Sequence, residues 1–223
     1  MKYVLWVSGL VLVLLIGYVA WTSLELNPTP PSAPVVEEPV LSSYASSTLG
    51  FSISYPKAFS LDERYAYDQF GEKKLIHGVK FTIPSEMATG TNLTSDSYIS
   101  VEQLPRARNC TGDIYLTANV RAETITENGR VYSLATSSGA AAGNLYEEFV
   151  YALSGSSPCT AIRYFIHSGN IGNYLPAEAS AQAGEEGSVR EFDRATLLAE
   201  FDKIRRSLSL TASNTGDAPT EAL

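Results

Sequence analysis

The sequence is poor in cysteine, histidine and charge. Only two cysteines and two histidines occur in 223 residues, and charged residues make up 18% of the chain. The formal net charge is −8. Nucleic-acid-binding domains present basic surfaces, so this balance argues against a nucleic-acid partner. It also argues against electrostatic docking on anionic lipid.

Residues 3–21 contain no charge and read YVLWVSGLVLVLLIGYVAW. Nineteen helical residues span about 28 Å, which matches one hydrocarbon core. The N-terminal flank has Lys2, whereas the other flank has no positive side chain before Lys57. The positive-inside bias predicts a retained anchor at 1–24 in the cell membrane, with a cytoplasmic N-terminus and the rest of the chain outside. A cleaved signal peptide is the alternative, although its best cleavage site, at Ala20, is poor.

The chain after the anchor is expected to form a linker, one domain and a tail. Residues 25–48 hold five prolines, which favour an extended, semi-rigid linker. Residues 49–210 carry the periodic apolar patterns and have the size of one ordinary domain. Residues 211–223 have no such pattern and are predicted to be disordered.

Alternating apolar and polar residues predict about seven strands in the domain. The predicted strands cover residues 49–55, 75–83, 98–104, 120–127, 130–136, 144–154 and 159–167. Asn128-Gly129 predicts a tight hairpin, because both central residues of a type I′ turn need positive φ. The small residues 138–144 are interpreted as a loop or a close approach of backbones.

A C-terminal helix is predicted over residues 192–208. Asp193 is a good N-cap, and Leu197, Phe201 and Ile204 fall on one apolar stripe. A shorter helix is expected at 113–119. Short connections favour antiparallel pairing. The fold class is therefore α+β: a twisted antiparallel sheet with the C-terminal helix on one face, preceded by a single transmembrane helix.

The two cysteines, Cys110 and Cys159, are predicted to form a disulfide if the domain lies in an oxidising compartment. The closed loop of about 50 residues corresponds to roughly 4 kcal/mol in the chain-entropy model. A reactive or metal-bound thiol is the alternative, but no Cys-x-x-Cys spacing supports it.

No motif for catalysis, metal binding or a cofactor is present. The sequence has no Gly-x-Ser-x-Gly, no Walker loop and no Gly-x-Gly-x-x-Gly. A hydrolase or transferase would have to use His77 or His167 with a nearby carboxylate. We therefore expect no catalytic residues, no metal and no cofactor.

Thirteen tyrosines are many for this length. Exposed tyrosines on loops can stack on sugars or peptides with little loss of entropy. One candidate group lies between strands in RYAYDQFGE, although a satellite cluster that covers the sheet edge is the favoured interpretation. A second lies in the loop that begins at His167 and, with the stretch up to Arg190, forms another candidate surface. The candidate binding residues are Tyr65, Tyr67, Phe70, His167, Asn170, Asn173 and Tyr174.

Two segments of the domain resemble a known group. Residues 50–56 read GFSISYP, and residues 201–210 read FDKIRRSLSL. Together they resemble the frame of PsbP-like and DcrB-like envelope proteins, the Mog1/PsbP fold. The middle, with IRYFIHSGNIGNY, also resembles uncharacterised single-span proteins of small-genome bacteria. The resemblance implies a non-enzymatic accessory or binding role and carries no catalytic residues. Many members have a lipidated cysteine where this chain has an anchor.

The sequence therefore predicts a membrane-anchored, extracytoplasmic and non-catalytic binding or accessory module. Its expected partners are the lipid bilayer, through residues 3–21, and an envelope protein, peptide or glycan. The alternative is an envelope hydrolase or transferase that uses His167 or His77.

Overall fold

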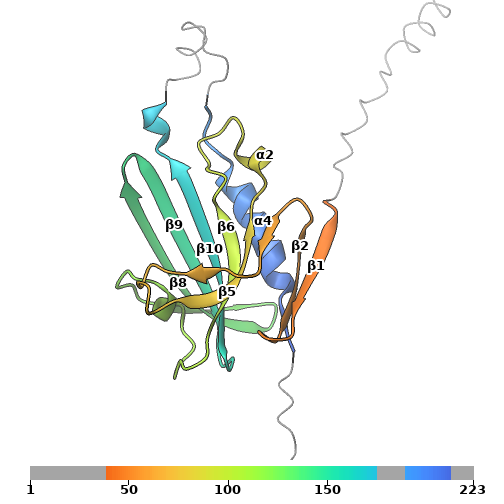
Figure 1. Cartoon of the computed structure of the whole chain (residues 1–223). Coiled ribbons are helices and arrows are strands. Elements are labelled where there is room, and N and C mark those ends of the chain that lie inside the picture. The colour runs from red at the N-terminus through yellow and green to blue at the C-terminus, as the bar shows by residue number, and fades with distance from the viewer. Residues whose placement is uncertain (1–38, 175–188, 212–223) are drawn as a thin grey trace, which may run out of the picture. The chain divides into compact units, whose positions relative to one another are not determined.

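The computed structural model of the chain describes residues 39–174 and 189–211 (Figure 1). All of them belong to one unit that begins at Pro39. The predicted anchor at residues 3–21, most of the predicted linker and nearly all of the predicted tail lie outside the described residues. Within the described ranges, no helix is long and apolar enough to cross a membrane.

The described residues form a large sheet, a small sheet and one long helix, all strand pairs being antiparallel. The large sheet has eight strands, ordered β3-β5-β6-β10-β9-β8-β7, with β4 also paired to β5. Its strands are β3 (Ser60–Asp62), β4 (Ala66–Tyr67), β5 (Ile76–Thr82), β6 (Tyr98–Leu104), β7 (Glu123–Glu127), β8 (Arg130–Ala141), β9 (Asn144–Leu153) and β10 (Cys159–Gly169). The small sheet contains β1 (Leu41–Ser46), β2 (Phe51–Pro56) and β11 (Ser209–Leu210). The helices are α2 (Ser85–Ala88), η1 (Gly112–Tyr115), η2 (Ile171–Asn173) and α4 (Arg194–Ser207).

The long helix α4 packs on one face of the large sheet, which we call the helix face (Figure 1). Its side chains Leu197, Phe201 and Ile204 are buried there. Phe201 meets Tyr164 of β10 at a ring-centroid distance of 5.3 Å. Phe51 of β2 is buried in the same core, so the small sheet closes this side of the domain.

The opposite, far face of the large sheet has a second core. Alternation along each strand places these residues on the side away from α4. Their buried members are Tyr65, Tyr67, Ile76, Tyr98, Tyr115, Leu116, Ala135, Val150, Ala152, Cys159 and Ala161. Segments that precede β5 and follow β6 supply the covering side chains.

Most expected elements are present. Asn128 and Gly129 have φ of 50° and 76° and join β7 to β8, which confirms the predicted hairpin. The helix over 192–208 is confirmed as α4, and the Asp193 side chain accepts a hydrogen bond from the Thr196 amide as an N-cap. The α+β class, with a C-terminal helix on one face of an antiparallel sheet, is confirmed.

Several details differ from the sequence-based expectation. The described residues contain eleven strands in two sheets rather than about seven in one. The strand predicted at 49–55 belongs to the small sheet, and its partner β1 lies inside the segment expected to be linker. Strands β3, β4 and β11 have only two or three residues, too few to show a period.

Two other segments were interpreted wrongly. Residues 138–141 continue β8, and Ala142 and Gly143 form a two-residue turn with φ of 49° and 81°. Small side chains show no apolar alternation, so this strand end looked like a loop. The helix expected at 113–119 is only the 3-10 turn η1, because its chain then runs along the far face in a non-helical conformation.

Candidate functional site

A buried charge cluster lies on the far face where β6, β10 and β9 are neighbours. Glu102 and Arg163 are both fully buried. The Arg163 guanidinium donates to both Glu102 oxygens, from Nε at 2.8 Å and from Nη2 at 2.9 Å. Its Nη1 donates to Glu148. Because buried ions need such partners, these three residues form one unit, called here the charge cluster.

Tyrosines from the covering segments close over the charge cluster. The Tyr65 hydroxyl lies 3.2 Å from Glu102 Oε1 and donates to it. The Tyr67 ring covers Arg163, with 3.6 Å between the guanidinium carbon and the ring centroid. The Tyr115 carbonyl accepts a further bond from Arg163 Nη2 at 2.7 Å. Glu102 and Arg163 are therefore sealed from solvent on the side away from the sheet, whereas the Glu148 side chain stays partly exposed.

Burial also fixes the protonation of these tyrosines. It raises the pKa of Tyr65 well above the ordinary value of 10.0, and the Glu102 carboxylate raises it further. Burial likewise raises the pKa of Tyr67, Tyr98 and Tyr115, although the Arg163 charge partly opposes this. All four hydroxyls therefore stay protonated near neutral pH and act as hydrogen-bond donors.

Beyond the charge cluster, the same face carries a row of aromatic rings, which we call the aromatic shelf: Tyr98, Tyr146, Phe165 and His167. Phe165 stacks on Tyr98 at 4.9 Å between ring centroids, with an angle of 23°. Tyr146 stacks on His167 at 4.6 Å and 20°. These pairs follow the sheet register, because Phe165 is opposite Tyr98 and His167 is opposite Tyr146. Three neighbouring strands thus form one continuous apolar floor.

The aromatic shelf is only partly covered. Rings of Tyr146, Phe165 and His167 remain partly exposed, whereas Tyr98 is buried. On the β8 side, Gly139 is opposite Tyr146, and a Cβ built there would meet nothing within 4 Å. In Figure 1, β8, β9 and β10 extend at the top beyond the segments that lie over their lower parts. Among residues 39–174 and 189–211, nothing covers the shelf at its β8 edge (Figure 1).

The lower part of the far face is covered tightly by η1. A Cβ on Gly112 would lie 2.7 Å from the Ala135 nitrogen and from the Val150 oxygen. The Gly112 amide also donates to the Ser133 hydroxyl at 3.1 Å. Only glycine permits this close approach of η1 to β8 and β9. The part of the far face under η1 is therefore covered, and the shelf lies beyond it.

His167 is the sequence candidate that lies on the shelf. Its Nδ1 is 2.9 Å from both oxygens of Asp96. Burial raises the pKa of Asp96, but hydrogen bonds from Thr94 and His167 outweigh this and lower the pKa. His167 Nε2 is buried and has no hydrogen-bond partner among the described residues. A general base needs a carboxylate that orients its ring and a free nitrogen that reaches the substrate. Asp96 supplies the carboxylate, but the enclosed Nε2 cannot reach a substrate.

The three candidate aromatics between β3 and β5 belong to the segment that covers the charge cluster. Tyr65 and Tyr67 are buried at 9% and 4% exposure, and Phe70 packs against them. The buried rings of Tyr65 and Tyr67 cannot stack on a ligand from solution, whereas Phe70 is only partly buried. The structure therefore places Tyr65 and Tyr67 in the satellite cluster that was the favoured interpretation.

The candidates after β10 hold the chain against the end of β10 and the turn between β8 and β9. The Asn170 side chain accepts from the Gly172 amide, and the Asn173 amide donates to the Gly143 carbonyl at 2.9 Å. A Cβ on Gly169 would lie 2.4 Å from the Tyr174 hydroxyl oxygen, so that ring packs on the end of β10. Most of the following stretch up to Arg190 lies outside the described residues.

The second histidine, His77, is exposed on β5, away from the shelf. It lines an open hollow of about 1150 Å³ together with Arg106, Arg108, Asp113 and Ile114. The loop that carries these arginines leads directly to the disulfide.

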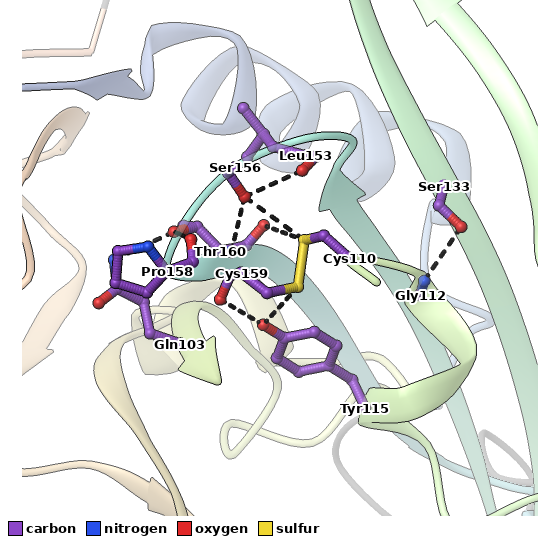
Figure 2. Close-up of a disulfide and its surroundings, with 10 residues drawn as sticks. All are labelled: Gln103, Cys110, Gly112, Tyr115, Ser133, Leu153, Ser156, Pro158, Cys159 and Thr160. Atoms are coloured by element: carbon purple, nitrogen blue, oxygen red, sulfur yellow. Dashed lines mark hydrogen bonds between the residues drawn. A yellow bond between two sulfur atoms is a disulfide. The ribbon is translucent and has the colours of Figure 1, made fainter. Parts of the chain in front are cut away.

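The Cys110–Cys159 disulfide is present, with 5.0 Å between the Cα atoms. It ties the chain after β6 to the first residue of β10. The Tyr115 hydroxyl donates to the Cys159 carbonyl at 2.7 Å, and Figure 2 shows it pointing toward the bridge. The predicted pairing is confirmed, and it anchors the segment that covers the charge cluster.

Sequence reasoning missed the charge cluster and most of the shelf. A signal was present: Arg163 and Glu102 each stand alone within an apolar strand run. A single charge in a central strand predicts a buried partner. Arg163, Phe165 and His167 also share one strand face, but their neighbours depend on strand order. The neighbouring acids Glu147 and Glu148 face opposite sides of the sheet, since Arg194 on α4 donates to Glu147 and Arg163 donates to Glu148.

Comparison with known proteins gives structural likeness only. No family model matches the chain, and no curated protein matches it. A solved structure from Bacteroides thetaiotaomicron has 11% identity and a TM-score of 0.41 and covers 77% of this chain, which spans 49% of that protein.

Two further solved structures belong to the group that the sequence resembles. Cyanobacterial PsbP (CyanoP) from Synechocystis has 14% identity and a TM-score of 0.37, covering 82% of this chain and 99% of its own. The Ran-binding protein Mog1p from Saccharomyces cerevisiae has 10% identity and a TM-score of 0.41, covering 78% and 96%.

Proposed function

We propose that this chain is a membrane-anchored, extracytoplasmic and non-catalytic binding module that holds a glycan on its aromatic shelf. The observation that carries the proposal is the open row of stacked rings across β6, β10 and β9. Single exposed apolar side chains are common, whereas a contiguous row of partly exposed rings is typical of a ligand-binding surface.

The chemistry of the shelf fits a sugar ring. The apolar C–H face of a sugar can stack on Phe165 and Tyr146, as other flat ligands stack on aromatic side chains. Glu148 and Asp96 lie at the shelf and are partly exposed or exposed. Each carboxylate has lone pairs beyond its present bonds and can accept from sugar hydroxyls. Tight packing of the neighbouring charge cluster on the same sheet face keeps this floor rigid, which lowers the entropy cost of binding.

The proposed location is supported by the sequence and agrees with the disulfide. Residues 3–21 have the length and composition of a membrane-spanning helix, and the charge bias around them favours an outside domain. A disulfide persists in oxidising compartments and is rare in the cytosol. A surface module on a tether suits the capture of an extracytoplasmic polymer.

A direct test is calorimetric titration of the full chain in detergent micelles with defined oligosaccharides. The probes are tetramers of β-1,4-linked N-acetylglucosamine, β-1,4-linked glucose and α-1,6-linked mannose. We expect at least one to bind, and Phe165→Ala to weaken it about tenfold or more, since ring stacking contributes roughly 1–3 kcal/mol. Tyr146→Ala should act in the same direction.

The matched control is Leu145→Ala. Leu145 is adjacent to Tyr146 on β9, is 40% exposed, and faces the other side of the sheet. It should leave binding unchanged. Failure of all three tetramers to bind, or equal losses in the Phe165 and Leu145 variants, would overturn the proposal. Binding of tyrosine- or proline-rich peptides in place of the tetramers would assign the shelf to a peptide instead.

A further inference from the structure

The outer edge of β1 is unpaired within the described residues. Strand β1 pairs with β2 on one side only, at the end of the sheet order β1-β2-β11. The strand has six residues, LSSYAS, none of them charged. Its neighbour in the chain, Val40, is 70% exposed, and Leu41 is 63% exposed.

The hydrogen-bond phase of the small sheet shows which groups point outward. The Lys57 amide donates to the Val40 carbonyl, so these two residues form a hydrogen-bonded pair of the β1–β2 ladder. In an antiparallel ladder every second pair is hydrogen-bonded, so the next such pairs are Ser42 with Tyr55 and Tyr44 with Ile53. Ser42 and Tyr44 therefore turn their backbone groups toward β2. Leu41, Ser43 and Ala45 turn their amides and carbonyls toward the free edge, and their side chains are exposed.

The other sheet edges are protected in ways that β1 is not. Edge strand β7 carries Glu123 and Glu127 at its two ends. Strands β3 and β11 have three and two residues. Charge and shortness are the usual means by which proteins prevent pairing at an edge. An uncharged six-residue edge is therefore an exception that needs an occupant.

The edge is complementary to a second copy of itself. In an antiparallel pair centred on Ser43, Ser43 faces Ser43 of the second copy, and Leu41 faces Ala45. All three outward residues are then bonded on both strands, giving six amide–carbonyl bonds. Centring the pair on Tyr44 instead would place Leu41 opposite Ser47, beyond the end of the strand.

The side chains agree with the same register. Exposed Leu41 packs on Ala45 of the second copy, which removes apolar surface from water. No charge of either copy lies within the paired strands. The formal net charge of the chain is −8, so two copies repel each other, and like charges facing each other across a paired edge would add to that repulsion.

We infer that β1 is a self-association edge, through which two copies form a two-fold symmetric pair with a continuous sheet β11-β2-β1-β1-β2-β11. Two six-residue strands bury less than the roughly 1,200 Å² of typical stable interfaces. The pair is thus weak in solution and strengthens when both copies share one membrane, a condition that rests on the anchor in the proposed function.

Cysteine cross-linking tests this pairing in the full chain. The native cysteines are bonded to each other, so Ser43→Cys introduces the single free thiol. Bonded antiparallel pairs have Cα atoms about 5.5 Å apart, within the range for a disulfide. Ser43→Cys chains are placed in phosphatidylcholine vesicles, oxidised with copper phenanthroline and separated on a non-reducing gel. We expect a covalent dimer.

Two comparisons make the result specific. Ser52→Cys lies on the same sheet face one strand away, where the two Cα atoms would be about 20 Å apart, and it should give at least tenfold less dimer. In the Ser43→Cys background, Ala45→Pro removes an outward amide while sparing the β1–β2 bonds, and should abolish the dimer. Ala45→Thr keeps that amide and should leave the dimer unchanged.

Equal cross-linking of the Ser43→Cys and Ser52→Cys chains, or a dimer that survives Ala45→Pro, would overturn the inference. Flotation of the same vesicles reports the anchor separately. Cross-linking decides the pairing whether or not the chain floats, because a disulfide captures even a weak pair.

Discussion

Replacing Glu102 with alanine removes the carboxylate on which the far face is built. The Glu102 carboxylate accepts two hydrogen bonds from Arg163 and one each from the hydroxyls of Tyr65 and Ser100. Arg163 would keep Glu148 but remain buried with its charge only partly compensated. Breaking a buried ion pair from one side costs about 3–5 kcal/mol. For a domain of this size, that corresponds to a fall in Tm of roughly 6–20 °C.

Urea unfolding of the full chain in detergent, followed by near-ultraviolet circular dichroism, measures this loss. The matched control is Glu147→Ala, on the opposite face of the sheet. Glu147 and Arg194 form a partly exposed ion pair, which contributes about 1 kcal/mol or less. The double variant Glu102→Met/Arg163→Met should recover much of the stability, because neither fully buried charge is then left alone and the Glu148 carboxylate is partly exposed to water.

If Glu102→Ala destabilised the domain no more than Glu147→Ala, water or a rearranged side chain would have to solvate Arg163. Glu102 and Arg163 would then not be sealed from solvent. An unrecovered double variant would instead show that the polar bonds, and not the charge, stabilise this face.

Other consequences can be measured on the same full chain. Burial raises the pKa of Tyr65, Tyr67, Tyr98 and Tyr115 above the ordinary value of 10.0. Their contribution to the free energy of unfolding should therefore be fully present below about pH 10 and fall above it by about 1.4 kcal/mol per pH unit for each tyrosine. Urea unfolding at several alkaline pH values measures this fall. Reducing the Cys110–Cys159 bond should lower the free energy of unfolding by about 2–5 kcal/mol, and thermal unfolding with and without dithiothreitol checks this. Gly112→Ala should destabilise the domain by about 1–3 kcal/mol because its Cβ would meet backbone, whereas Gly139→Ala meets open space and should be neutral or slightly stabilising in the same assay.

Elements that depend on local pattern could be predicted from the sequence. The strand at 98–104 coincides with β6, because its apolar run ends at a proline that cannot continue the ladder. The turn at Asn128-Gly129 and the cap at Asp193 were likewise predictable, since each depends on a residue's own backbone preference or side-chain reach. Helix α4 followed from its apolar stripe.

Features that depend on strand order could not be predicted. Glu102 and Arg163 are 61 residues apart and meet only because β6 and β10 are neighbours in the sheet. The shelf needs β9 on the other side of β10 as well, so its rings come from three separate segments. Tyr65 and Tyr67 looked exposed because their segment is short and polar, yet it folds over the charge cluster.

Under the proposed function, the aromatic shelf holds the ligand and the hollow beside His77 does not. Chemical-shift mapping of the isotopically labelled full chain in micelles, titrated with each of the three tetramers, distinguishes the two surfaces. The proposed function predicts shifts at Tyr146, Phe165 and His167 and none at Arg106 and Arg108. Shifts confined to the arginine-lined hollow, or no shifts with any tetramer, would contradict it.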